Sequence, residues 1–133
     1  MSERGDRFEI PDAAALLGTA RATLMSDLLP AVPAEQRYTA LMVANAMGIA
    51  AREITLGPQA RIREIERLRP LAGQDVAPSA PADDDVHALR RAVCAAIRDG
   101  RFDDDAHATA LHDALLAIAI DRLAISDPKA IRE

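Results

Sequence analysis

The chain of 133 residues has almost no aromatic side chains, with two phenylalanines, one tyrosine and no tryptophan. Half of its residues are nevertheless hydrophobic, and most of these are alanine or aliphatic. Aromatic and β-branched residues are typical of strands, whereas alanine and leucine favour helices. We therefore expect an all-α fold, and a single helical domain over residues 1–133 is long enough to have its own core.

Cys94 is the only cysteine, which excludes an intramolecular disulfide framework and a cysteine zinc cluster. It follows Val93 on an apolar helix face, so we expect a buried thiol and not a nucleophile, which would need a nearby base. The six glycines are scattered singly, which argues against a phosphate-binding loop. No cofactor and no catalytic residue are expected, although an enzymatic role stays open.

An excess of basic charge is also missing, because the formal net charge is −5. An acidic chain has little general affinity for nucleic acid or anionic membranes. The longest apolar run, residues 40–51, is well short of the ~20 residues that cross a bilayer. The N-terminal residues are charged and lack the apolar segment of a signal peptide, so we expect a cytoplasmic protein.

Prolines, glycines and acidic residues divide the remaining sequence into helices. Pro11, Pro33 and Pro58 suit first helical turns, and Gly57 and Gly100 suit the left-handed residue after a helix. These signals predict a five-helix bundle with a frayed N-terminus (1–10) and a flexible connector (about 70–82). The helices are expected at about residues 11–28, 33–56, 58–69, 84–99 and 104–125.

The second predicted helix is apolar on two opposite faces. One face carries Tyr38, Met42 and Ile49, and the other carries Val43 and Met47. A helix that is apolar on both sides is expected to be surrounded by other elements. We therefore predict a central buried helix at about 33–56.

The third predicted helix has a narrower apolar stripe. Ile62, Ile65 and Leu68 are expected to face inward, and arginines with Glu64 are expected to face outward. The outer face is locally basic, which is typical of a solvated surface with compensating pairs. The alternative is a docking patch for an acidic partner.

The fifth predicted helix also has two apolar faces, one with Leu115 and Ile118 and the other with Leu116 and Ile120. One fully surrounded helix is easy to accommodate in a domain of this size, whereas two are not. We therefore expect one apolar face to be buried against a second copy of the chain in a homodimer.

Two acidic segments, Asp83 to His87 and Asp103 to His107, echo each other twenty residues apart. Carboxylates and imidazoles at such spacing can bind metal. Each segment also lies where a helix starts, and carboxylates there accept hydrogen bonds from free backbone amides. Helix capping is the favoured interpretation, His112 is poorly placed for shared ligation, and no metal is expected.

Polar residues on the apolar faces of the second and fifth predicted helices need partners, because unpaired buried polar groups cost about 1 to 3 kcal/mol each. We predict one polar network between these helices, formed by Asn45, Arg52, Glu53, Asp121 and Arg122. One interpretation is structural, in which the network fixes helix register. The other is a pocket in which Arg52 and Arg122 hold the carboxylate or phosphate of a ligand.

Several segments together resemble a bacterial family of small helical proteins of unknown function. The segments are PDAAALL (11–17), LLP (28–30), VANAM running to AREI (43–54), LGP (56–58) and LAISDP (123–128). Members of that family are encoded near aminoglycoside-phosphotransferase-like kinases and acyl-CoA dehydrogenases. The resemblance implies an accessory role beside such an enzyme and supplies no catalytic residues to carry over, and relatives often have lysine at position 122.

Two functions are therefore expected to compete. The favoured one is a non-enzymatic, homodimeric interaction module that works with a kinase-like phosphotransferase or an acyl-CoA dehydrogenase. The other is a binding protein or enzyme for an anionic or acyl metabolite, using the polar cluster between the second and fifth helices.

Overall fold

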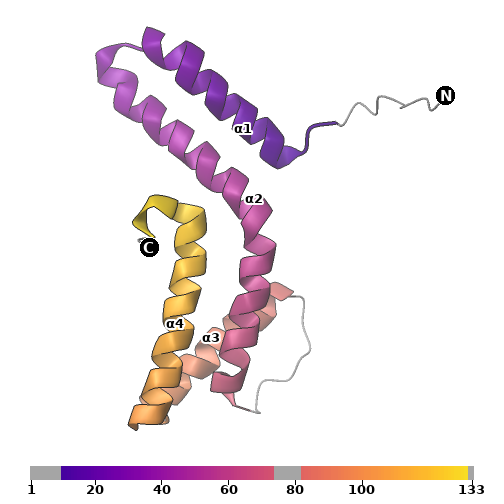
Figure 1. Cartoon of the computed structure of the whole chain (residues 1–133), viewed down its shortest axis with the longest axis vertical. Coiled ribbons are helices and arrows are strands. Elements are labelled where there is room, and N and C mark those ends of the chain that lie inside the picture. Colours follow the sequence, from indigo (N-terminus) through magenta and orange to yellow (C-terminus); the bar gives the residue numbers. More distant parts are fainter. Residues whose placement is uncertain (1–9, 74–81, 132–133) are drawn as a thin grey trace, which may run out of the picture. The chain divides into compact units, whose positions relative to one another are not determined.

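The computed structural model describes residues 10–73 and 82–131, and within these ranges all regular structure is helical (Figure 1). The expected all-α class is confirmed. Four α-helices are present in the described residues, not five. They are α1 (Ala13–Thr23), α2 (Arg37–Ala72), α3 (Ala82–Arg98) and α4 (Asp105–Ser126).

Helix boundaries follow the local signals at several positions. Asp12 Oδ1 accepts a hydrogen bond from Ala15 N at 2.8 Å at the start of α1, and Pro30 lies in the 3-10 turn (Leu29–Ala31) that follows α1 and its π-helical extension. Gly100, after α3, has φ +77, a conformation in which a residue with Cβ is strained. The predicted stop at Gly100 is therefore confirmed.

The predicted break at Gly57 and Pro58 is wrong, because α2 is continuous through both residues and through Pro70. Gly57 does not adopt the positive φ that ends a helix, and Gly73, with φ +80, follows the last residue of α2 instead. Pro58 removes one backbone donor from the helix. Burial of residues on the C-terminal side of Pro58 accounts for helical continuation, since packing can override local propensity.

Contacts within the chain fall into two compact units, Met1–Thr55 and Leu56–Glu133, so α2 contributes to both. The first unit is a helical hairpin in which α1 runs beside the N-terminal part of α2 (Figure 1). Arg21 Nε on α1 donates to the Ala44 carbonyl oxygen of α2 at 3.2 Å. The expectation of a single domain stays a prediction.

The prediction that the helix at about 33–56 is buried is wrong. The helix begins as a 3-10 turn (Ala34–Gln36) and continues as α2, but between residues 37 and 55 only Ala44 and Gly48 are buried. Tyr38, Met42 and Val43 are exposed. The hairpin provides only one neighbour, α1, and α1 covers the small-residue face of α2 and not its two wider apolar faces.

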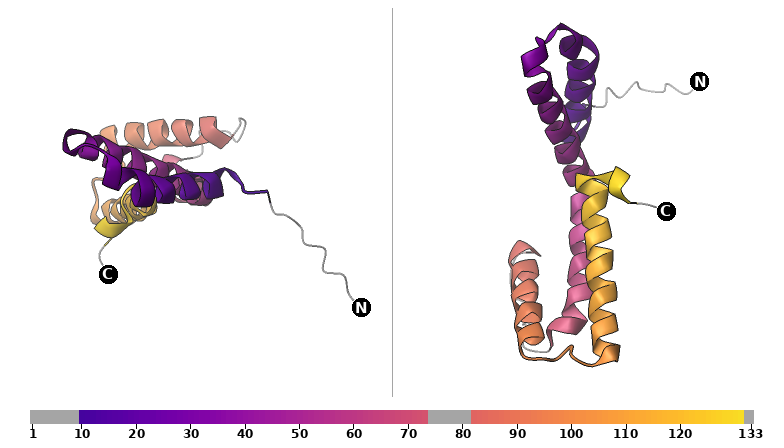
Figure 2. Two further views of the ribbon diagram at one scale, coloured as in Figure 1. Left: turned by 90° about the horizontal axis from the view of Figure 1, so that it is seen from above. Right: turned by 90° about the vertical axis from the view of Figure 1, so that its left-hand side faces the viewer.

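The second unit has a core shared by the C-terminal part of α2, α3 and α4 (Figure 2). Leu68 and Ala72 of α2 pack with Leu89 and Val93 of α3, and Leu111 and Ile118 of α4 pack against this cluster. Val86, Leu89 and Val93 of α3 are buried, whereas Ile97 is 43% exposed.

Two segments from the sequence predictions lie outside the described residues. The frayed N-terminus falls on residues 1–10, of which only Ile10 is described. Most of the connector predicted at about 70–82 falls on residues 74–81, while residues 70–72 belong to α2 and Ala82 begins α3.

Leu89 provides a direct test of this core because it is 2% exposed, whereas Leu116 on α4 is 51% exposed. We expect Leu89→Ala to lower the free energy of unfolding by roughly 2 to 5 kcal/mol, since a buried leucine truncation loses apolar burial and leaves a cavity. Leu116→Ala should cost less than about 1 kcal/mol. Urea denaturation followed by circular dichroism measures both, and equal losses would contradict the assigned core.

Candidate functional site

The buried face of α2 in the second unit contains one carboxylate. Ala60, Glu64, Leu68 and Ala72 recur every fourth residue and are all buried, so they form one stripe along the helix. The Glu64 side chain is only 7% exposed. The prediction that Glu64 faces outward and Ile62 inward is therefore wrong, because α3 and α4 pack on the Ala60–Ala72 stripe and leave Ile62 exposed.

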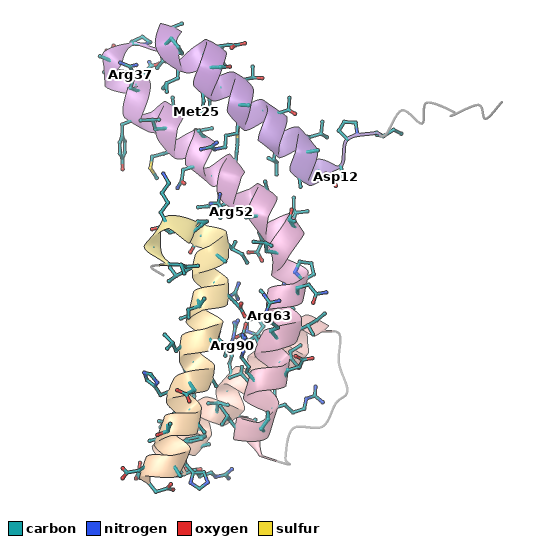
Figure 3. All side chains as sticks on the ribbon, viewed as in Figure 1. Asp12, Met25, Arg37, Arg52, Arg63 and Arg90 are labelled. Carbon is teal, nitrogen blue, oxygen red and sulfur yellow. The ribbon has the colours of Figure 1, made fainter. Side chains whose placement is uncertain are left out.

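Arg90 of α3 satisfies the Glu64 carboxylate with two hydrogen bonds. Arg90 Nε donates to Oε1 at 2.7 Å and Nη2 donates to Oε2 at 2.9 Å, the fork geometry that arginine makes with a carboxylate. These bonds raise the pKa of Arg90, so the guanidinium stays charged. The pair joins α2 to α3, and Arg90 is labelled in Figure 3.

Asp121 of α4 is the second carboxylate with arginine partners. Arg63 Nε and Nη2 on α2 donate to its two oxygens, each at 3.1 Å, and Arg67 Nη1 also donates to it. The bonds from Arg63, and then those from Arg67, hold the pKa of Asp121 below its usual value, against the partial burial that would raise it. Asp121 therefore joins α4 to two consecutive turns of α2.

Arg122 follows Asp121 and lies near the other carboxylate. Its Nη2 is 3.9 Å from Glu64 Oε2, which is an ion pair but longer than a hydrogen bond. Arg63 of α2 therefore pairs with Asp121 of α4. The next residues along these helices, Glu64 of α2 and Arg122 of α4, form a second pair with the charges reversed. Four guanidinium groups surround two carboxylates in this cluster, which leaves a local excess of positive charge.

The five residues predicted to form one polar network belong to different units. Asp121 and Arg122 are in the second unit, where their partners are Arg63, Arg67 and Glu64. Asn45 and Glu53, in the first unit, are exposed. A network that joins all five residues, and the anion pocket inferred from it, stay predictions.

Arg52, the remaining member of the predicted network, is half-buried in the first unit and is labelled in Figure 3. A Cβ atom on Gly48 would lie 3.3 Å from both Arg52 Nη1 and Arg21 Nε. The absence of a side chain at Gly48 therefore leaves room for the side chains of Arg21 and Arg52 to lie against α2 at this position. Arg21 was not among the predicted polar residues.

The partners that sequence reasoning missed were Arg63, Glu64, Arg67 and Arg90. Outward-facing pairs within α2 were expected for the first three. A signal was present in the four-residue spacing of Ala60, Glu64, Leu68 and Ala72, which puts Glu64 on an apolar stripe. The short helix predicted at 58–69 ends before Ala72 and therefore cuts this stripe.

The acidic segment before α4 caps that helix, as predicted. Asp104 Oδ1 accepts from His107 N at 3.0 Å, and Asp104 Oδ2 lies 2.5 Å from His107 Nδ1. The backbone bond, followed by the imidazole contact, lowers the pKa of Asp104. In the described ranges no three histidine, cysteine or acidic side chains are grouped for metal binding, and the side chains of Asp83–Asp85 lie outside the description.

Cys94 is exposed, which contradicts its predicted burial. Between residues 86 and 98 of α3 the buried positions are Val86, Leu89, Val93 and Ala96, and Cys94 is one residue, or 100°, away from Val93. It lies on the wall of a groove of about 310 Å³ between α2, α3 and α4.

None of the described helices combines the length and apolar character needed to span a membrane.

A comparison with protein families matches residues 30–130 to the model described as "Domain of unknown function (DUF6285)". This range includes the whole of α2, α3 and α4, and therefore every member of the charged cluster. No curated protein and no solved structure matches the chain.

Arg90→Met tests whether the buried carboxylate depends on its partner. We expect it to destabilise the protein by about 2 kcal/mol at neutral pH, because Glu64 is left buried without its two hydrogen bonds. Arg91→Met, at the neighbouring exposed position, should cost little. The double variant Glu64→Leu/Arg90→Met should recover most of the loss, and a double variant as unstable as Arg90→Met alone would argue against this account.

Asp121→Asn tests the second pair through pH. The lowered pKa of Asp121 means that its contribution is present above the usual aspartate pKa of about 3.9 and is lost as the pH falls through the folded-state value. We expect the variant to be about 1 kcal/mol less stable at pH 7, and the difference to shrink below about pH 4. Urea denaturation across pH, with the exposed Asp99→Asn as control, measures this, and a pH-independent difference would contradict it.

Proposed function

The chain belongs to the DUF6285 family, and we propose that it acts as a non-enzymatic helical interaction module that forms a homodimer and assists a metabolic enzyme. One observation carries this proposal: between residues 10 and 55 several large apolar side chains are exposed, and none is fully buried. The only buried residues in this range are Ala44 and Gly48.

The exposed side chains gather on α2. Tyr38 is 74% exposed, and Met42 follows it one turn later on the same face, with Asn45 and the half-buried Ile49 beyond. All eleven residues of α1 are described, and none of them is buried. Helices of this length gain most of their stability in proteins from packing an apolar face, so this hairpin needs a further surface to pack against.

A second copy of the chain suits this surface by its chemistry. Tyrosine and methionine are enriched in protein interfaces, where charged residues are depleted. Between residues 10 and 55 the sequence has three arginines and four acidic residues, a net charge of −1, although the whole chain carries −5. Two such faces would meet with little electrostatic repulsion.

The assisted enzyme is proposed from the family resemblance described above. A kinase-like phosphotransferase or an acyl-CoA dehydrogenase is the expected partner. A module of this kind would contribute binding surface and leave the chemistry to the enzyme. Its own charged cluster in the second unit suits a structural role, because each of the two carboxylates receives two or more arginine hydrogen bonds.

Met42→Glu tests the dimer. We expect the wild type to sediment as two copies at micromolar concentration, and the variant to raise the dimer dissociation constant roughly 30-fold or more, the effect of losing an interface hot spot. Gln59→Glu adds the same charge at an exposed position of α2 in the other unit and should change the constant less than twofold. Analytical ultracentrifugation measures all three proteins.

A wild type that sediments as a monomer at micromolar concentration would refute the dimer. Co-expression with the kinase-like phosphotransferase or the acyl-CoA dehydrogenase tests the accessory role separately. A stoichiometric complex that survives size-exclusion chromatography is expected with one of them. Absence of a complex with both, from a dimeric protein, would refute the accessory role alone.

A further inference from the structure

The groove in the second unit is bounded by all three of its helices. Its volume of about 310 Å³ is at the lower end of the range of ~300 to 1,000 Å³ that holds small molecules. Its walls are aliphatic, and two of the wall residues, Ile97 and Leu115, are exposed although they are large. The aliphatic wall consists of Leu68, Val93, Ile97, Leu115 and Ile118.

Glu64 and Arg90 also line the groove, so charged groups are available to a ligand whose chain lies along the aliphatic wall. Arg90 and Glu64 neutralise each other through their two hydrogen bonds. Arg122 then adds a positive charge, because its Nη2 lies 3.9 Å from Glu64 Oε2. The Arg122 side chain is 52% exposed and makes no hydrogen bond to Glu64 at this distance, so its donors remain available to an anion.

We propose that this groove binds a medium-chain aliphatic carboxylate, with the chain along the apolar wall and the carboxylate at Arg122. The excess positive charge selects an anionic head over a cationic one, and the guanidinium fork matches a carboxylate. A protein partner would need about 800 Å² of surface on each side for a stable interface, which is far more than eight lining residues provide. The groove lies in the second unit, so this proposal does not depend on the dimer proposed through the first.

Cys94 makes the proposal measurable because it is the only cysteine, is exposed and lines the groove. We expect octanoate to slow the reaction of Cys94 with the neutral reagent iodoacetamide at least fivefold, in a saturable manner and below the micelle concentration. Acetate, which lacks the chain, and octylammonium, which has the opposite charge, should protect at least tenfold more weakly.

Arg122→Gln tests the contribution of the octanoate carboxylate separately from that of its aliphatic chain. It should raise the half-protecting octanoate concentration about tenfold, the effect of losing a charge-assisted hydrogen bond. Arg91→Gln removes the same charge from an exposed position of α3 that does not line the groove, and should leave that concentration unchanged. Circular dichroism confirms folding of each variant, and the comparison of octanoate with octylammonium on the wild type decides the question even if a variant is unstable.

Four results would overturn the proposal. The first is unchanged Cys94 reactivity in octanoate, and the second is equal protection by octylammonium. The third is an equal effect of Arg122→Gln and Arg91→Gln. The fourth is protection that rises with protein concentration in the absence of octanoate, which would show that a second copy of the chain covers the groove.

Discussion

The Glu64 carboxylate is the constraint on which the second unit depends. It lies on the buried stripe of α2, where an unpaired charge would be far more costly than any single apolar contact is favourable. Arg90 must therefore reach it from α3, and the fork geometry allows only a narrow range of helix positions. The pair thus helps to set the register between α2 and α3, while the surrounding leucines and valines supply apolar burial.

Asp121 positions α4 in a similar way. Two arginines from successive turns of α2 bind it, so α4 is aligned along α2 by charges at the edge of the core. The sequence also predicted a polar network that fixes helix register. The observed ion pairs include Arg63, Glu64, Arg67 and Arg90, which the predicted network did not contain. Asp121 pairs with Arg63 and Arg67, and Arg122 pairs with Glu64, so these partners come from residues 63–67 of α2.

The two units use their apolar residues differently. The second unit buries leucine and valine among three helices, while the hairpin of the first unit buries only an alanine and a glycine and leaves Tyr38 and Met42 exposed. Such a contrast is expected when one part of a chain forms its own core and another provides a surface for binding. It is also the physical basis for the proposal that the chain self-associates through the first unit.

The sequence by itself determined the all-α class, the helix starts at Asp12 and Asp104, and the stop at Gly100, because these depend on local backbone chemistry that composition and spacing reveal. Tertiary structure alone decided that α2 continues through Gly57 and Pro58, since packing beyond the proline outweighs a lost donor. It also decided which faces are buried. Glu64 was expected at the surface and is buried, and Cys94 was expected in the core and is exposed. Both outcomes follow from where α3 and α4 pack, which no local sequence pattern specifies.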